Sequence, residues 1–385
     1  MATESWFDSF PERRGTDSEK WADVPAGVIP MFVADMDFRS PQCVIDALRE
    51  RTEHGMYGYS MVPDSFYDAF ISWERRIHGC TVAREEILLS AGVITGLQWS
   101  MKALTPEKGA LIFHPSYPPF MGVPKALGKP LFTLEMEARD GKWTVDFDAF
   151  ERLAAGGEID AFILCNPHNP TGRSWTREEL TRMLSICKAH GITVYSDEIH
   201  GDIVMPEEEF VSVLSLPAEV AGEAVVLTAP SKTFNLPGLQ TSCIVVRSAE
   251  KREKIAALMG NNHIPGPTFM GITAATAAYR DGEEWMREMN RYVSGNFDLM
   301  KEFFARKLPQ ISFIRPQATY LAWLDFRAAG LSSEELDRRL IEAGVRLGKG
   351  TNYGEKAGEG YMRLTAACPR SLLSEALSRI EKALS

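Results

Sequence analysis

The sequence predicts an α/β protein in which a mostly parallel sheet is covered by helices on both faces, together with a smaller α+β part. Short apolar runs of strand length alternate with helical patterns through the middle of the chain. Continuous apolar strands of this kind are typical of a parallel sheet that is buried on both sides. The chain has 385 residues, of which 45% are hydrophobic, so it can bury one large core and one smaller core.

The first third of the chain predicts an arm, two helices and a strand that leads into a third helix. Pro41 suits a first helical turn, and Asp64 is expected to cap the second helix. A strand that meets glycine before a helix presents backbone N–H groups to an anion. In order, the predicted elements are an arm at 1–30, an extended segment at 31–38, a helix from 41 to about 51, a loop at 57–60, a helix at 64–78, a strand at 87–92 and a helix at 94–104.

The middle of the chain repeats the alternation of strands and helices. Thr176 and Glu179 form a capping box at the start of the helix 176–190, and Gly191 ends it. Further strands are predicted at 110–113, 161–165, 192–195, 225–227 and 243–246. These elements together predict one large α/β domain over residues 50–285.

The C-terminal part changes character. A long helix at 283–307 leaves the large domain, strands follow at 312–314, 320–324 and 361–364, and helices follow at 333–343 and 369–383. We therefore expect three regions, which are residues 1–49 as an arm with part of the small domain, 50–285 as the large domain, and 286–385 as the small C-terminal domain.

Composition limits the classes of partner. The net charge of −10 and the pI near 5.4 argue against nucleic acid or an anionic membrane as the main partner. A small molecule is the expected partner. The N-terminus shows no signal-peptide pattern, and no apolar run is long enough to span a bilayer, so we expect a cytoplasmic protein. No CxxC spacing predicts zinc, and a reduced compartment is expected for the cysteines, Cys43, Cys80, Cys165, Cys187, Cys243 and Cys368.

Polar and aromatic residues follow several of the predicted strands. Open α/β sheets bind their ligands beyond the carboxyl ends of the strands, so these residues are expected to meet in one site. Lys232 stands out because Pro230 and Pro237 hold it on a rigid turn after the strand 225–227. The residues at these strand ends are Gly92, Tyr117, Asn166, Asn169, Asp197 and Lys232.

A lysine, a carboxylate, a stacking aromatic and an anion-binding helix start are the parts that a pyridoxal phosphate (PLP) enzyme needs. Lys232 would hold the cofactor's aldehyde, which requires a neutral amine. Asp197 would pair with the pyridine nitrogen, Tyr117 would stack on the ring, and Asn169 would donate to the ring oxygen. The N–H groups that follow Gly92 would bind the phosphate, at Val93 and Ile94.

Each of these residues also has a structural explanation when it is taken alone. Asp197 is equally suited to capping a helix, Tyr117 to lying between prolines at a rim, and Asn169 to an ordinary turn. Only their combination favours a cofactor site.

Four motifs resemble, in order and spacing, the fold-type I, aspartate aminotransferase-like superfamily of PLP enzymes. They are Asn-Pro-His-Asn-Pro-Thr-Gly at 166–172, Ser-Asp-Glu-Ile-His at 196–200, Ser-Lys-Thr-Phe-Asn at 231–235 and Tyr-Met-Arg-Leu at 361–364. Within the superfamily, the segments 33–38, 54–60, 319–325 and 363–370 resemble the MalY/PatB branch of cystathionine β-lyases.

This resemblance implies a three-layer PLP-binding domain and assigns further roles. Arg363 would clamp the substrate's α-carboxylate, aided by a backbone N–H near Ala34. Tyr59 matches a tyrosine that reaches the cofactor of the neighbouring subunit, with Tyr57 as the alternative, so a homodimer with shared active sites is implied.

The chain departs from the wider superfamily at the phosphate site. The serine and the arginine that many aminotransferases place around the lysine are replaced by Ala229 and Gln240. The phosphate would then depend on the backbone after Gly92, with Ser231, Thr228 and Tyr59 as side-chain candidates. His200 either bonds near the ring or is a packed imidazole.

The implied reaction is α,β-elimination on L-cystathionine or a related L-cysteine S-conjugate, which yields a thiol, pyruvate and ammonia. Lys232 would act as general base at Cα. A PLP-dependent aminotransferase is the alternative, because it shares the early steps. A PLP-binding protein whose main role is regulatory contact with a partner is the third hypothesis.

Overall fold

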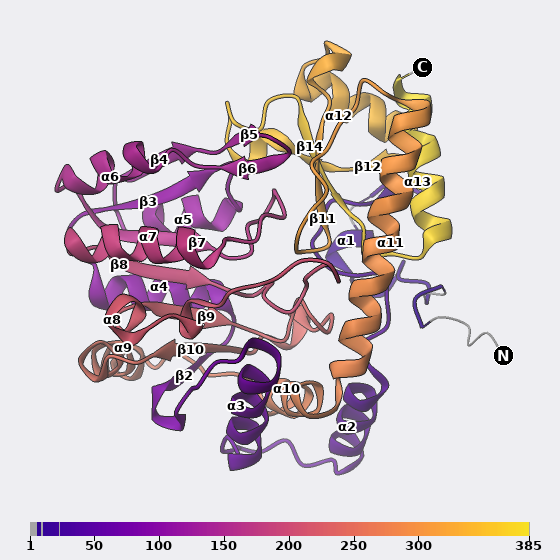
Figure 1. The fold of residues 1–385 in the computed structure, drawn as a ribbon. Coiled ribbons are helices and arrows are strands. Elements are labelled where there is room, and N and C mark those ends of the chain that lie inside the picture. Colours follow the sequence, from indigo (N-terminus) through magenta and orange to yellow (C-terminus); the bar gives the residue numbers. More distant parts are fainter. Residues whose placement is uncertain (1–5, 9–10, 23, 385) are drawn as a thin grey trace.

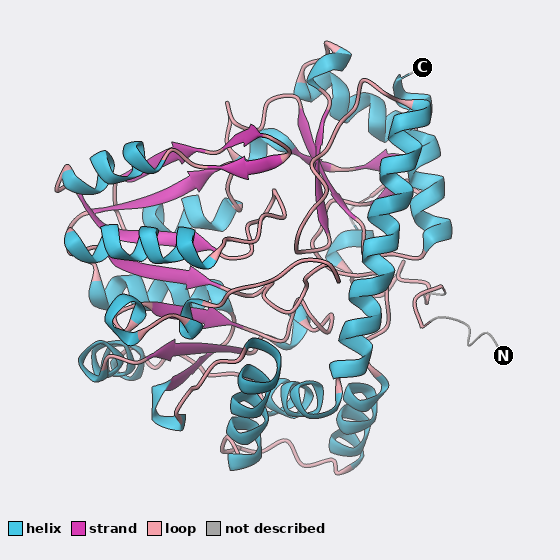
Figure 2. Cartoon of the chain, in the orientation of Figure 1, coloured by secondary structure: helices cyan, strands magenta, loops and turns pink. Residues whose placement is uncertain are grey.

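The computed structural model describes residues 6–8, 11–22 and 24–384, and Figures 1 and 2 show its layered arrangement. The central sheet contains β2 Ile87–Ser90, β3 Gly109–His114, β4 Leu131–Glu135, β7 Ile159–Cys165, β8 Thr193–Asp197, β9 Val225–Thr228 and β10 Ser242–Val246. In the described chain these seven strands lie in the order β2-β10-β9-β8-β7-β3-β4. All neighbours pair in parallel except β10, which is antiparallel to both β2 and β9. The predicted mostly parallel sheet is therefore confirmed.

Helices cover both faces of this sheet. They are α4 Val93–Leu104, α5 Pro118–Ala126 and α9 Ala249–Asn261 on one face, and α6 Phe147–Ala155, α7 Arg177–Ala189 and α8 Ala218–Ala221 on the other. Successive strand residues point to opposite faces, so Ile112 packs in the first core and Phe113 in the second. Both faces are apolar, which explains why the strands are continuous hydrophobic runs.

Three helices pack together beside the β2 edge, namely α2 Gln42–Glu53, α3 Asp64–His78 and α10 Phe269–Asp281. The rings of Phe70 and Trp73 on α3 contact the ring of Tyr279 on α10. From this end the long helix α11, Glu283–Lys307, runs along the side of the molecule to the C-terminal part (Figure 1). Its bounds match the predicted helix.

The C-terminal part has its own small sheets. β11 Leu321–Asp325, β14 Tyr361–Thr365 and β13 Gly348–Lys349 form an antiparallel sheet, and β1 Ile29–Pro30 pairs in parallel with β12 Val345–Arg346. The remaining elements are α1 Glu19–Ala22, α12 Ser333–Glu342, α13 Arg370–Leu384 and the hairpin of β5 Glu137–Arg139 with β6 Lys142–Thr144. The division into regions at residues 50 and 286 stays a prediction, and residues 1–5, 9, 10 and 23 of the predicted arm lie outside the described chain.

Three local predictions need correction. The segment 312–314 is not a strand: Ser312 makes a single bridge to Asp325, and Pro316 lacks the N–H that pairing would require. The segment 31–38 is a loop, because several of its backbone groups bond to side chains rather than to a strand. Asp64 is the first residue of α3 and not its cap, since its carboxylate contacts Arg84.

Two further sequence features have clear outcomes in the structure. The capping box of α7 is confirmed, with the Glu179 N–H donating to Thr176 Oγ1 at 3.2 Å and the Thr176 N–H donating to Glu179 Oε2 at 2.8 Å. Within the described residues, none of the helices combines the length and the apolar character that crossing a bilayer requires.

Candidate active site

A cavity of about 400 Å³ lies at the carboxyl ends of β7, β8 and β9, where the sheet meets the start of α4. The structure brings most of the predicted site residues to its wall. These are Ala34, Gly92, Val93, Ile94, Tyr117, Asn169, Asp197, His200, Ser231 and Lys232. Residues far apart in the sequence converge there because parallel strands share one carboxyl edge.

Lys232 lies on the non-helical turn that the flanking prolines predict. Its Nζ donates to the Ala34 carbonyl at 2.7 Å. Burial, followed by the nearby guanidinium of Arg363, lowers the pKa of Lys232 to about 8, although Asp35 and Asp197 act in the opposite direction. A substantial fraction of this amine is therefore neutral near physiological pH, as a nucleophilic lysine requires.

Asp197 is the last residue of β8 and is buried. Its Oδ1 accepts from the Ile199 N–H at 3.0 Å. Burial raises the pKa of Asp197 to about 7, while that hydrogen bond and the charge of Lys232 act to lower it. No ion pair joins Lys232 to Asp197 within the described chain, so the carboxylate faces the cavity without a cation of its own.

Arg363 lies on β14 of the C-terminal part and contacts the cavity wall through Asn169. Its Nη1 donates to Asn169 Oδ1 at 3.1 Å, and its Nη2 donates to the Phe32 carbonyl at 2.7 Å. The guanidinium also lies over the Tyr353 ring, 4.9 Å from the ring centre. Among the described residues, its buried Nε has no hydrogen-bond partner. A guanidinium with a remaining donor is suited to binding a carboxylate.

The opposite end of the cavity offers backbone groups to an anion. Gly92 precedes α4 with φ of 131°, a conformation that L-residues rarely adopt, and the first residues of the helix, Val93 and Ile94, line the cavity. Ser231 lines the same cavity, together with Gln240 and Thr241. Thr228, in contrast, does not line it.

The two rings of this site have different environments. Burial lowers the pKa of His200 well below its usual value, so the imidazole is neutral, and its buried Nδ1 has no hydrogen-bond partner among the described residues. Tyr117 precedes α5 at the cavity wall, and burial raises the pKa of its hydroxyl. Both rings are placed where they can contact a ligand.

Tyr59 lies outside the cavity of its own chain. Its side chain is fully exposed, and neighbouring Met56, Tyr57 and Met61 are also largely exposed. A role for Tyr59 in a site therefore needs a second copy of the chain.

Sequence reasoning gave no role to several residues that shape this site. Tyr320 donates to the Ala34 carbonyl at 2.9 Å, Tyr353 lies under Arg363, and Asn235 bonds both backbone groups of Met36. Tyr320 and Asn235 lie inside motifs that carried the resemblance, so their position was a usable signal. Tyr353 had no such signal.

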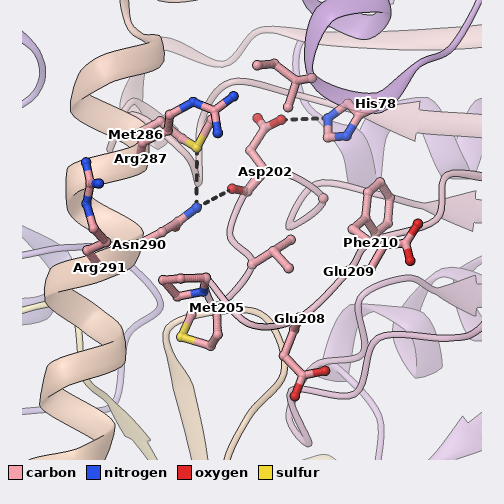
Figure 3. Close-up of a pocket in the computed structure, with 14 residues that line it drawn as sticks. His78, Asp202, Met205, Glu208, Glu209, Phe210, Met286, Arg287, Asn290 and Arg291 are labelled. Carbon is pink, nitrogen blue, oxygen red and sulfur yellow. Dashed lines mark hydrogen bonds and ion pairs between the residues drawn. The ribbon is translucent and has the colours of Figure 1, made fainter.

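A second cavity, of about 470 Å³, lies beside α11 and the segment that follows β8 (Figure 3). Its buried acid and imidazole bond each other: His78 Nε2 bonds Asp202 Oδ1 at 2.7 Å, and Asn290 donates to the Asp202 carbonyl at 2.8 Å. Asp202 Oδ2 accepts from Thr233 Oγ1 at 2.7 Å, next to Lys232. We assign the active site to the smaller cavity, because its acid and base remain available to a ligand.

The aminotransferase class I and II family model matches residues 27–380 of this chain. The chain therefore belongs to this family, and the resemblance found in its motifs is confirmed. It is 39% identical to cystathionine β-lyase PatB of Bacillus subtilis (strain 168), over 98% of this chain and 100% of PatB, and 31% identical to protein MalY of Escherichia coli (strain K12), over 98% of both.

The solved structures agree with the fold. A PLP-bound putative aminotransferase from Clostridium difficile 630 superimposes with a TM-score of 0.95 at 34% identity, covering 98% of this chain and 99% of that protein. The aspartate aminotransferase-like fold predicted from the sequence is thus confirmed.

Proposed function

We propose that this chain is a PLP-dependent carbon–sulfur β-lyase that cleaves L-cystathionine or related L-cysteine S-conjugates to a thiol, pyruvate and ammonia. The observation that carries the proposal is one cavity that contains Lys232 and Asp197, with Arg363 at its side. The near full-length similarity to PatB supports the lyase reaction over others in the family.

The cavity fits PLP by its donor set. The buried His200 Nδ1 and Arg363 Nε have no hydrogen-bond partner among the described residues, so a bound ligand could supply one. Asp197 would hold the ring nitrogen, Asn169 the ring oxygen, and Tyr117 the ring face. Gly92, Val93 and Ile94 would bind the phosphate through the start of α4, with Ser231 beside them. Thr228 and the partner-side Tyr59 remain further candidates for the phosphate.

When bound, PLP supplies an electron-withdrawing ring that stabilises negative charge at the substrate's α-carbon. Arg363 fixes the α-carboxylate, and a backbone N–H near Ala34 assists it. Lys232 Nζ removes the proton from the α-carbon, and its pKa of about 8 suits a general base at neutral pH. The buried carboxylate of Asp197 would stabilise a positive charge on the ring nitrogen that it faces. The thiolate then leaves from Cβ, with a proton from Lys232 Nζ or a water.

The walls of the cavity favour elimination over transamination of dicarboxylic amino acids. Arg363, which is assigned to the α-carboxylate, lies behind the cavity wall at Asn169, and the described residues that line the cavity add no second arginine for another carboxylate. The Clostridium difficile neighbour carries the name putative aminotransferase, so amino transfer is the second candidate function.

Two copies of the chain are expected to form the working enzyme. The loop at 55–62 exposes Met56 at 68%, Tyr57 at 58% and Met61 at 93%, and Tyr59 projects fully from it. Apolar side chains grouped in this way mark an interaction surface. Tyr59 of each copy would then reach the other copy's cofactor. A purified protein that is monomeric by light scattering at micromolar concentration would contradict the shared site.

One assay tests the reaction. The purified, PLP-loaded protein should form pyruvate and thiol from L-cystathionine without any keto-acid acceptor, and borohydride should abolish its yellow absorption band. Lys232→Ala should remove this turnover. Amino transfer that depends on a keto acid, without pyruvate release, would establish the aminotransferase instead.

A further inference from the structure

The loop at residues 32–38, which we call the carbonyl loop, connects the two principal groups of the site. The Phe32 carbonyl accepts from Arg363, and the Ala34 carbonyl accepts from Lys232, each at 2.7 Å. Backbone oxygens therefore hold both the predicted carboxylate clamp and the predicted base. A displacement at the Phe32 carbonyl weakens the bond that orients the Arg363 guanidinium, whereas the position of Lys232 is also set by its rigid turn between Pro230 and Pro237.

Side chains more than strand pairing hold the carbonyl loop, and besides Arg363 and Lys232 they include Tyr320, which donates to the Ala34 carbonyl at 2.9 Å, and Asn235, which donates to the Phe38 carbonyl at 2.9 Å. The Asp37 N–H donates to the Ala367 carbonyl at 2.9 Å, and Asn235 bonds both the N–H and the carbonyl of Met36 at 3.0 Å. Thr365 Oγ1 donates to the Val33 carbonyl at 2.8 Å. Its two carboxylates are on the other side, toward the N-terminal arm.

Two cations of the arm hold these carboxylates. Arg13 contacts Asp35 through both oxygens, at 2.6 and 3.4 Å, and contacts Asp37 Oδ1 at 2.8 Å. Lys20 Nζ contacts Asp37 Oδ2 at 2.7 Å and the Asp35 carbonyl at 3.2 Å. The side chains of Lys20 and Asp37 are 0% exposed, so this ion pair is dry. Charges are buried in this way only when geometry and hydrogen bonds compensate for their lost hydration.

The arrangement is balanced in charge and in hydrogen bonds. Two cations face two carboxylates, and the Trp21 indole N–H adds a bond to Asp37 Oδ1 at 2.8 Å. Arg13 also donates to the Met36 carbonyl at 3.0 Å. The arm therefore grips the loop through its side chains and its backbone, immediately behind the Ala34 carbonyl.

We propose that Arg13 and Lys20 are positioning residues for the substrate: they hold the carbonyl loop so that the Phe32 carbonyl orients Arg363 toward the substrate's carboxylate. The proposal rests on the proposed function, because it needs an amino-acid substrate in this cavity. Losing the grip should weaken substrate binding in the ground state and the transition state alike, which raises KM and leaves kcat nearly unchanged.

Arg13→Met is the first variant to test. Its pair with Asp35 is partly exposed, at 20% and 15% of the two side chains, and the buried Asp37 keeps Lys20 and Trp21 as partners, so the fold should tolerate the loss. Arg14→Met is the matched control from the same arm: the Arg14 guanidinium donates to the Val28 carbonyl and lies over the Trp21 ring, and within the described residues it has no hydrogen bond to the carbonyl loop. Arg13→Lys keeps the positive charge but loses the bidentate contact with Asp35.

Two measurements separate this role from general stability. Steady-state kinetics of pyruvate formation should show KM raised about tenfold in Arg13→Met with kcat within about threefold, Arg13→Lys between, and Arg14→Met within about twofold of the parent. Hydrogen exchange of the peptide covering 32–38, measured without substrate, should be faster in Arg13→Met only.

The outcomes are distinct. An Arg13→Met enzyme with unchanged KM overturns the proposal, even if its loop exchanges faster. A parent protein that forms no pyruvate, but whose carbonyl loop loosens only in Arg13→Met, refutes the proposed lyase function and leaves the grip itself established. Unchanged hydrogen exchange of the peptide 32–38 in Arg13→Met would show that Arg13 does not hold the carbonyl loop.

Discussion

Two buried acid–base pairs lie at the turn that contains Lys232 and Thr233, and they are arranged in opposite ways. Lys232 and Asp197 share a cavity without an ion pair, and burial moves both toward their neutral forms, with pKa values of about 8 and about 7. His78 and Asp202 bond directly at 2.7 Å, and Trp73 and Thr233 complete the bonding of Asp202.

The difference separates a structural pair from a reactive one. A buried carboxylate with three donors is fully satisfied and stabilises the fold. A buried carboxylate that faces an open cavity has an incomplete environment, which a cationic ligand can complete. Identical residue types thus have different uses according to whether the protein itself satisfies them. The following predictions test that distinction.

Asp197→Asn should produce the largest effect on catalysis. Asparagine cannot hold a positive charge on its side of the cavity, so kcat/KM for pyruvate formation should fall by about 10³-fold. The melting temperature should change little, because burial already disfavours the charged form of Asp197 and asparagine is neutral. Kinetics and thermal melts on the same preparation check both parts. An Asp197→Asn enzyme with unchanged activity would contradict the role assigned to Asp197 in the reaction.

Asp202→Asn should do the reverse. Asparagine leaves the buried His78 without its hydrogen-bonded carboxylate, although Glu74 and Glu198 stay nearby, and the stability should fall by about 3 kcal/mol. The kcat of the folded protein should stay within about tenfold of the parent, since Asp202 contacts the turn only through Thr233. Denaturant unfolding and activity corrected for the folded fraction measure these effects. A loss of activity as large as that of Asp197→Asn would erase the distinction.

Arg363→Ala should change the titration of Lys232 as well as substrate binding. Burial lowers the pKa of Lys232 most, and the guanidinium lowers it further. Without that cation the pKa rises, so the pH at which the amine becomes neutral moves upward. The rate at which protein stripped of PLP takes the cofactor up again, followed by absorbance from pH 6.5 to 9.5, should therefore reach half its maximum at higher pH in the variant. A shift to lower pH would contradict the assigned charge effect.

The sequence predicted most of this fold because its strongest signals are local. Continuous apolar strands and the capping box at Thr176 depend on neighbouring residues, and they appear as expected. The prediction of an extended segment at 31–38 was wrong because its conformation is set by Asn235, Arg363 and the arm, which are remote in sequence. Local patterns contain no information on such long-range bonds.

The candidate site divides in the same way. Lys232 and Asp197 were found because they follow strands whose carboxyl ends must converge. The pairing of Asp202 with His78 depends on α3 packing against the segment after β8, and no spacing rule links those positions. The outward direction of Tyr59 was likewise set by a loop without periodicity.

The smallest expected effect is the part of the pH dependence of stability that the structural pair contributes through His78. Burial lowers the pKa of His78, but its bond to Asp202 and nearby acids raise it to about 9. A raised pKa means that the folded state holds the proton more tightly, so this stabilisation is complete below pH 6.5 and is lost as pH rises to 9. Burial also raises the pKa of Glu74 to about 7, so its buried carboxylate lowers the stability as pH rises toward 7 and changes it little above that pH. Above about pH 8 the lowered pKa of Lys232 makes the stability rise with pH, which opposes the effect of His78. Over the interval from pH 7 to 9 the melting temperature of the parent should fall by a few degrees relative to that of His78→Gln, because both proteins share the contribution of Lys232 and the variant lacks that of His78. Parallel slopes in the two proteins would show that another group titrates there, and that His78 is not held as a cation.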